Sequence, residues 1–203
     1  GPLDAGVYAS QFINLRSQGS AWAPRFGAVT YAVPDGWAND ADWPGWFGLT
    51  PQSEYEHWTS EGGTASGIRV HADASAVSTA RPCSGSPAAG IAHTPAAILA
   101  SLQDVPGLVV GSTAPIRVDG HAGFVVDLSV DEATIVPCDG GDRVVEYLVA
   151  GGDGQALAAG SRARLVLLAD GATTFSITIE APAADFSRLV PTAMRTVESM
   201  QFK

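Results

Sequence analysis

Five aromatic side chains in the first third of the chain have the residue types and the setting that ligand recognition needs. They are Trp37, Trp43, Trp46, Tyr55 and Trp58, and turn-forming prolines and glycines lie among them. A flat aromatic face can stack on a sugar ring or anchor a partner protein. We therefore predict a binding surface in this segment. The alternative is that some of these rings, Trp37 above all, close one end of the hydrophobic core.

Three glutamates, Glu54, Glu56 and Glu61, are the residues that would suit acid–base catalysis of glycoside hydrolysis. That reaction needs two carboxyl groups about 5–10 Å apart across a cleft, which sequence spacing does not establish. The sequence also contains no Gly-x-Ser-x-Gly, His-Glu-x-x-His or Walker motif. We therefore name no catalytic residue and keep a hydrolase as the third of three hypotheses.

Metal binding is poorly supported by the spacing of the candidate ligands. Asp35, Asn39, Asp40 and Asp42 lie close together, but they lack the alternating register and the distal glutamate of a calcium loop. The four histidines are scattered, and no two of them lie two or four residues apart. We expect neither a metal ion nor another cofactor.

The only two cysteines, Cys83 and Cys138, each follow a proline in a polar loop. Two cysteines cannot complete a zinc site alone, and this pair is too far apart for a redox Cys-x-x-Cys motif. We predict that they form a disulfide, with a reactive thiol and two buried free thiols as alternatives. A disulfide would place the domain outside the cytoplasm.

Size and charge narrow the possible partners. The 203 residues, 46% of them hydrophobic, fit one domain over 3–203, and Gly1-Pro2 is typical of the remnant of a tag-removal protease. The net charge of −10 disfavours nucleic acid and anionic lipid. No apolar run approaches 18 residues, so membrane attachment would come only from an anchor upstream of Leu3.

Two helices are predicted by their caps and apolar spacing. Thr94 suits an N-cap and Pro95 the first helical position, so one helix begins there and ends before 106–107. A second helix begins near Asp185 and carries an apolar stripe that includes Val197. Pro191 interrupts this helix, and we expect it to kink or break there.

The rest of the chain predicts a mostly antiparallel sheet of seven or eight strands. Nine segments are the candidates for these strands, at 7–13, 28–33, 46–49, 68–71, 116–118, 124–130, 144–149, 163–168 and 173–179. Apolar and polar residues alternate along 173–179, which predicts one buried face and one face in water. With the helices packed on the sheet, the fold class is α+β.

Several short segments together resemble a known family. They include Ala32-Val33-Pro34-Asp35-Gly36-Trp37, with further matches at 42–45, 94–99, 106–108, 118–123 and 164–168. These segments and the order of elements resemble the Mog1/PsbP-like family, which includes actinobacterial envelope lipoproteins of the LpqN type. The resemblance implies an αβα sandwich and an extracytoplasmic binding or accessory role. It supplies no catalytic residues, because that fold has no common active site.

The leading hypothesis is a non-enzymatic domain, secreted or anchored at the cell surface, that binds a partner protein or glycan of the cell envelope. Asp40 and Asp42 would rim the aromatic surface and favour a neutral glycan or a basic protein. The second hypothesis is a small-molecule or lipid-binding module with an apolar pocket between sheet and helix. Exposed tryptophans would favour the first, an enclosed apolar cavity the second, and converging polar groups with perturbed pKa values a hydrolase.

Overall fold

An eight-stranded antiparallel sheet is the framework of the computed structural model. The description covers residues 1–10, 28–43, 45–61, 66–136, 138 and 143–203, with the backbone alone for 57–61. In spatial order the strands are β1 (Pro2–Leu3), β4 (Trp37–Trp43), β5 (Trp46–Pro51), β6 (Gly67–His71), β13 (Thr173–Pro182), β12 (Ser161–Asp170), β9 (His121–Val130) and β8 (Leu108–Val118). Pro2 and Leu3 thus belong to the sheet, because they pair with β4.

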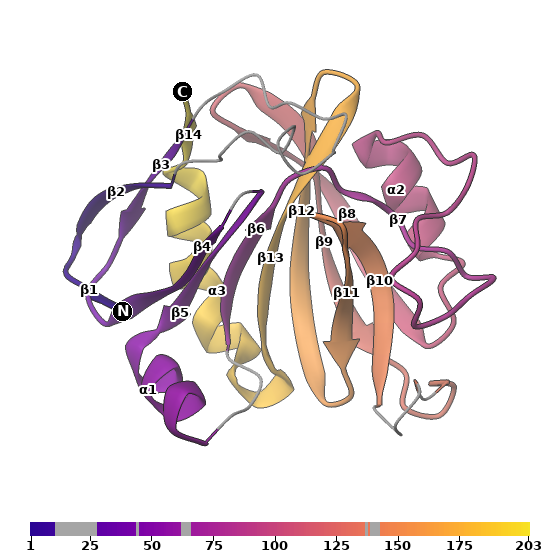
Figure 1. The fold of residues 1–203 in the computed structure, drawn as a ribbon, viewed down its shortest axis with the longest axis horizontal. Coiled ribbons are helices and arrows are strands. Elements are labelled where there is room, and N and C mark those ends of the chain that lie inside the picture. The colour runs from indigo at the N-terminus through magenta and orange to yellow at the C-terminus, as the bar shows by residue number, and fades with distance from the viewer. Residues whose placement is uncertain (11–27, 44, 62–65, 137, 139–142) are drawn as a thin grey trace.

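Two small sheets and three helices complete the part of the chain that the structure describes (Figure 1). The small sheets are β14-β3-β2 and β11-β10-β7. Their strands are β2 (Gly6–Ser10), β3 (Val29–Val33), β14 (Gln201–Phe202), β7 (Ser75–Ala76), β10 (Val144–Ala150) and β11 (Asp153–Ala158). The helices are α1 (Gln52–Glu61), α2 (Pro95–Leu102) and α3 (Ala183–Glu198). The α+β class predicted from the sequence is confirmed.

One face of the large sheet is covered by α3 and β3. Phe175, Ile177 and Ile179 alternate along β13 and are buried against the apolar stripe of α3, which includes Val190 and Val197. The opposite face is covered by α2 and β10, which share a second apolar cluster with β9 and β12. The helices therefore lie on both faces of the sheet, in the order that an αβα sandwich requires.

We predicted a kink or a break at Pro191, and the break is wrong, because α3 continues through this residue. Proline removes the hydrogen bond to the Ser187 carbonyl, four residues earlier. Both residues are exposed, so water can bond that carbonyl instead. The sequence analysis also missed β4, β11 and α1. The start of α2 is as predicted, with the Ala97 amide donating to the Thr94 hydroxyl.

The prediction that the polar face of β13 lies in water is also wrong. Thr174, Ser176 and Thr178 are buried. The layer formed by α2 and β10 covers this face, so strand alternation separates two different buried environments. The Thr178 hydroxyl forms a hydrogen bond of 3.2 Å with the Tyr147 hydroxyl, and the Thr174 hydroxyl donates to the His93 carbonyl at 3.0 Å. These bonds offset the cost of burying the two hydroxyl groups.

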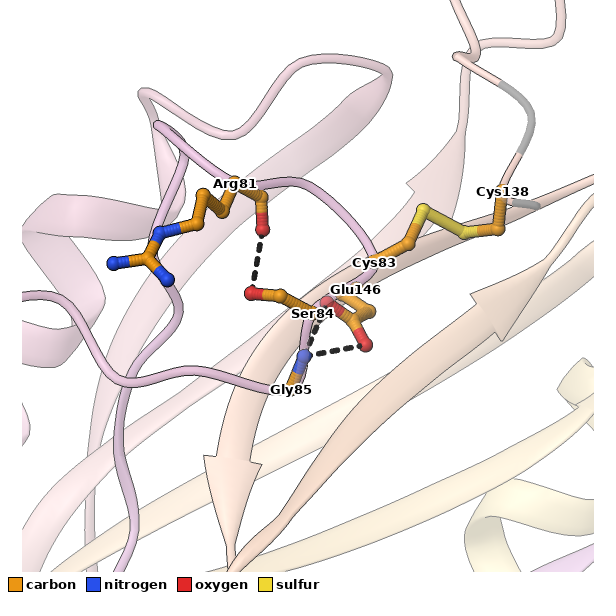
Figure 2. Close-up of a disulfide and its surroundings, with 6 residues drawn as sticks. All are labelled: Arg81, Cys83, Ser84, Gly85, Cys138 and Glu146. Atoms are coloured by element: carbon orange, nitrogen blue, oxygen red, sulfur yellow. Dashed lines mark hydrogen bonds between the residues drawn. A yellow bond between two sulfur atoms is a disulfide. The ribbon is translucent and has the colours of Figure 1, made fainter.

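The predicted disulfide between Cys83 and Cys138 is confirmed, and it joins two loops far apart in sequence (Figure 2). The two Cα atoms are 5.6 Å apart, which suits a disulfide. Beside it, the Gly85 amide donates to both carboxylate oxygens of Glu146, at 3.1 and 3.2 Å. The loop that carries Cys83 is thus joined covalently to Cys138 and by a hydrogen bond to Glu146 of β10.

The apolar stripe of α3 gives a first prediction. Val197→Asp places an unpaired charge in a fully buried position, so we expect the free energy of unfolding to fall by at least about 3 kcal/mol. Urea unfolding followed by circular dichroism measures the change. Ser187→Asp on the exposed face of the same helix is the control, with an expected change below about 0.5 kcal/mol. Equal effects of the two variants would contradict the assignment of the core.

The disulfide gives a second prediction. Replacing both Cys83 and Cys138 by serine removes a cross-link between residues 55 positions apart, which the chain-entropy relation values at about 4 kcal/mol. We expect the urea midpoint of the double variant to match that of the wild type in reductant, and both to lie well below that of the oxidised protein. A midpoint that reductant leaves unchanged, or two titratable thiols in the untreated protein, would contradict the bond.

Candidate functional site

A row of four side chains crosses the α2 face of the large sheet. Trp43 lies directly opposite Trp46, Trp46 opposite His71, and His71 opposite Ser176. Directly opposed residues in antiparallel strands share a face, so all four point the same way. The Trp46 and His71 rings stack with centroids 5.6 Å apart and planes 13° apart. The row begins at an exposed tryptophan and ends at a buried serine.

A second row, one step further along the strands, holds a buried ion pair. Gly48 of β5 lies opposite Arg69 of β6, and Arg69 lies opposite Thr178 of β13. Asp40 occupies the irregularity in β4 and bonds the Arg69 guanidinium at 3.0 Å. A Cβ atom on Gly48 would lie only 2.2 Å from Oδ1 of Asp40. Glycine is therefore required at position 48 for the carboxylate to lie over the sheet.

A second glycine makes room for the guanidinium. A Cβ atom on Gly67 would lie 2.9 Å from Nη1 of Arg69 and 2.3 Å from the Leu49 carbonyl oxygen. Gly67 lies opposite Glu180 of β13, so Glu180 shares this face of the sheet with Arg69, whose charge acts on its carboxyl group. The two glycines explain how three charged side chains fit on one face of the sheet.

The pKa values of this region are displaced by burial. Burial raises the pKa of Glu180 to about 7, and the charge of Arg69 partly offsets the rise. Burial and then the Arg69 charge lower the pKa of His71 to about 4, so the ring is neutral at pH 7. Burial also raises the pKa of Tyr147. Displaced pKa values that share one charged neighbour are typical of functional sites.

Exposure decreases from the tip of the β4–β5 hairpin inward. The Trp43 side chain is 60% exposed and Trp46 is partly buried, whereas the side chains of Arg69 and Asp40 are 24% and 10% exposed. We call Trp43, Trp46, His71, Arg69 and Glu180 the aromatic shelf. It offers an accessible indole on the same face of the sheet as charged hydrogen-bonding groups, which suits a ligand whose rings carry hydroxyl groups.

The five predicted binding residues do not form one surface. Trp43 and Trp46 come together, but Trp37 is 4% exposed and belongs to the core under α3, as the alternative reading proposed. Tyr55 lies on α1, which follows the opposite end of β5 from Trp46 (Figure 1). The side chain of Trp58 is outside the described residues.

The expected acidic rim is wrong for both of its members. Asp40 is largely buried and paired with Arg69, so it lies behind the shelf. Asp42 is exposed but lies opposite Phe47, whose side chain belongs to the core on the α3 face. Its carboxylate accepts a hydrogen bond from the Ser10 hydroxyl on that side. The irregularity in β4 separates the two aspartates onto opposite faces.

The other sequence candidates do not converge on a cleft. Glu54 and Glu56 lie on α1, and Glu56 accepts a hydrogen bond from the Gln52 amide at 2.9 Å. The side chain of Glu61 is outside the description. Among the described residues no cluster of three potential ligands could hold a metal ion. An apolar cavity beside Cys83 measures about 30 Å³, enough for one water molecule.

Three residues of the shelf were missed by the sequence analysis, namely Arg69, His71 and Glu180. One usable signal was Arg69, because this charged residue lies inside the short strand 68–71 between the apolar residues Ile68 and Val70. Glu180 was assigned to a face in water, which made it unremarkable. The glycines at 48 and 67 carry no signal by themselves, because their role depends on neighbours from other strands.

Comparisons with known proteins give remote structural likenesses. No protein-family model matches the chain, and no curated protein matches it. A crystal structure from Bacteroides thetaiotaomicron has a TM-score of 0.44 and 9% identity, covering 99% of this chain and 49% of its own. This chain therefore spans about half the length of that one.

Two further structures are similar over nearly their whole length. LpqN, described as involved in cell envelope biogenesis of Mycobacterium tuberculosis, has a TM-score of 0.41 and 12% identity, covering 97% of this chain and 91% of its own. Cyanobacterial PsbP (CyanoP) from Synechocystis has a TM-score of 0.40 and 9% identity, covering 100% and 96%. At these values the likeness carries no argument about function. In the described part of the chain no helix has the length and apolar character to cross a membrane.

The displaced pKa values give a third prediction. Glu180 ionises near pH 4.5 when unfolded and near pH 7 when folded, so its contribution to stability is full below pH 4.5 and is lost as the pH rises to about 7. His71 acts in the opposite direction, because its contribution is lost as the pH falls from 6.5 to about 4. The two effects largely cancel between pH 4.5 and 6.5.

The variant Glu180→Gln removes one of these two pH-dependent contributions to stability, that of the Glu180 carboxyl group. We compare the free energy of unfolding of the variant with that of the wild type at each pH. We expect the difference, variant minus wild type, to increase by roughly 3 kcal/mol between pH 4.5 and 7.5 and then to level off. Urea unfolding at a series of pH values measures the difference. Glu198→Gln, at an exposed position, should show no such trend. A difference that stays constant across this range would contradict the burial of the Glu180 carboxyl.

Proposed function

We propose that this chain is a non-enzymatic extracytoplasmic domain that binds a neutral glycan of the cell envelope on its aromatic shelf. The observation that carries the proposal is the exposure of Trp43, directly opposite Trp46 on the same face. Hiding indole area from water is worth about 25 cal/mol per Å², so an exposed tryptophan beside another needs an explanation. The usual explanation is that such a pair of tryptophans forms a binding surface.

The chemistry behind the tryptophans supports a glycan over an apolar ligand. A sugar ring presents apolar C–H groups on one face and hydroxyl groups at its edge. Trp43 can stack on the face, while Arg69 and Glu180 lie on the same side of the sheet as hydrogen-bonding groups. The net charge of −10 disfavours anionic sugars.

The state of the carboxylates supports binding over hydrolysis. Glycoside hydrolysis uses two carboxyl groups facing a common cleft. Here Oδ2 of Asp40 pairs with Arg69, and its Oδ1 is buried over Gly48. Glu180 is the carboxyl of the shelf, and among the described residues it has no ion-pair partner. The shelf therefore has the recognition groups of a glycan site without the second carboxylate.

The disulfide supports the extracytoplasmic location. Disulfides persist in oxidising compartments and are rare in the cytoplasm. The bond between Cys83 and Cys138 would therefore form and persist in such a compartment. Secretion, with or without a surface anchor, is the arrangement that we propose.

A fourth prediction tests the shelf. We expect neutral oligosaccharides on an array to bind the wild-type protein, and uronic-acid oligosaccharides to bind less. Trp43→Ala should weaken binding at least about tenfold, because stacking contributes roughly 1.4 kcal/mol or more. Isothermal titration with the best oligosaccharide measures the loss. Since the side chain is mostly exposed, the free energy of unfolding should change by less than about 0.5 kcal/mol.

The matched control is Val109→Ala, which removes an exposed apolar side chain from β8, at the other end of the sheet. It should leave glycan binding unchanged. Acrylamide quenching of tryptophan fluorescence adds an independent readout, since Trp43→Ala should reduce the quenchable fraction and added oligosaccharide should do the same in the wild type. An array without neutral ligands, or unchanged affinity in Trp43→Ala, would overturn the proposal.

A further inference from the structure

A separate hollow lies on the same face of the sheet, at the end occupied by β8 and β9. It is an open groove of about 600 Å³ between the first turn of α2 and the β8–β9 hairpin. Its principal lining residues are Pro95, Pro115, Arg117, Ala122, Phe124 and Ala169. In the strand order, β8 and β9 are at the opposite end from β4 and β5, so the groove is distinct from the aromatic shelf.

We propose that this groove is a binding site for a small apolar carboxylate. The inference does not depend on the proposed glycan site, because it rests on other residues. Three features carry it: a volume in the range of small-molecule pockets, a mostly apolar lining, and one cation at the edge that has no carboxylate partner within the described protein.

Strand register explains why the groove exists. Pro115 of β8 lies opposite Phe124 of β9, and Arg117 lies opposite Ala122, so these four side chains share the α2 face. The methyl group of Ala122 leaves the hollow that a larger side chain would fill. Beneath the groove β9 and β12 approach closely, because a Cβ atom on Gly123 would lie only 1.8 Å from the Leu167 carbonyl oxygen. Position 123 therefore requires glycine.

The lining determines the body of the ligand. The groove is bounded by proline rings, alanine methyl groups and the partly buried Phe124 ring, so apolar contact dominates. Burying apolar surface there gains about 25 cal/mol per Å². Because the groove is open to solvent along one side, it suits a short chain or a ring that leaves a polar end in water.

Arg117 determines the charge of the ligand. Its Nη1 donates to the Gly120 carbonyl at 2.6 Å, which holds the guanidinium at the groove while its other N–H groups stay available. The chain has 21 acidic and 11 basic residues, and several other arginines pair with carboxylates. A guanidinium without such a partner beside an apolar groove complements an anionic head group, and a carboxylate matches its planar geometry.

A fifth prediction tests this site with three probes of equal chain length: octanoate, 1-octanol and octylammonium. Amide chemical-shift titration should show saturable binding of octanoate at β8, β9 and the start of α2. We expect octanoate to bind roughly tenfold more tightly than 1-octanol, and octylammonium to bind most weakly. Arg117→Gln should remove the preference for octanoate while leaving the affinity for 1-octanol unchanged.

Two variants complete the design. Ala122→Trp fills the groove from an exposed strand position and should abolish binding of all three probes. Trp43→Ala alters the aromatic shelf alone and should leave octanoate binding unchanged. Thermal unfolding checks that each variant folds. If Ala122→Trp unfolds, the selective loss in Arg117→Gln still decides the question.

Three outcomes would overturn the proposal. The first is a linear, non-saturating response to octanoate. The second is octanoate binding that survives in folded Ala122→Trp. The third is equal affinity for octanoate and 1-octanol in the wild type, because the carboxylate would then contribute nothing. None of these results bears on the glycan proposal, which is tested with other ligands and other variants.

Discussion

The buried polar face of β13 is the constraint on which the rest of the structure depends. The strand lies inside the eight-stranded sheet, and its apolar residues face α3, so its hydroxyl-bearing residues are forced against the opposite layer. Buried polar groups cost free energy unless they are hydrogen-bonded. The opposite layer supplies partners for two of the three hydroxyl groups, with the Tyr147 hydroxyl at Thr178 and the His93 carbonyl at Thr174. The position of that layer is thereby fixed against the sheet.

The polar face of β13 also connects the core to the candidate site. From β13 the α2 face continues onto β6. Burial there raises the pKa of Glu180 and lowers that of His71, and the charge of Arg69 partly offsets the first change and adds to the second. Arg69 is in turn held by Asp40, and the exposed tryptophan lies beyond it at the hairpin tip. The groups that satisfy the interior therefore also form the shelf, so in the function that we propose stability and recognition would use the same charges.

Both proposed sites lie on the α2 face for one geometric reason. The layer of α2 and β11-β10-β7 covers the middle of the sheet, where β12 and β9 carry their apolar cluster. The strands at either end extend past this cover, with the aromatic shelf at β4–β6 and the groove at β8–β9. Glycines at 48, 67 and 123 let side chains or neighbouring backbone approach closely at these ends.

Local rules were sufficient for the disulfide, the capped start of α2, the apolar stripe of α3 and most of the sheet strands, because each depends on residues close in sequence or on the only two cysteines. These rules failed where the burial of a side chain depends on which layer packs against its strand face. Alternation in 173–179 shows that two faces differ, but only the tertiary structure decides that the polar face is buried. The aromatic segment predicts a binding surface, yet only the tertiary structure separates buried Trp37 from exposed Trp43 and places Arg69 and Glu180 on the same face of the sheet as Trp43. A sequence encodes which side chains share a strand face, and the packing of layers determines whether that face meets water, a core or a ligand.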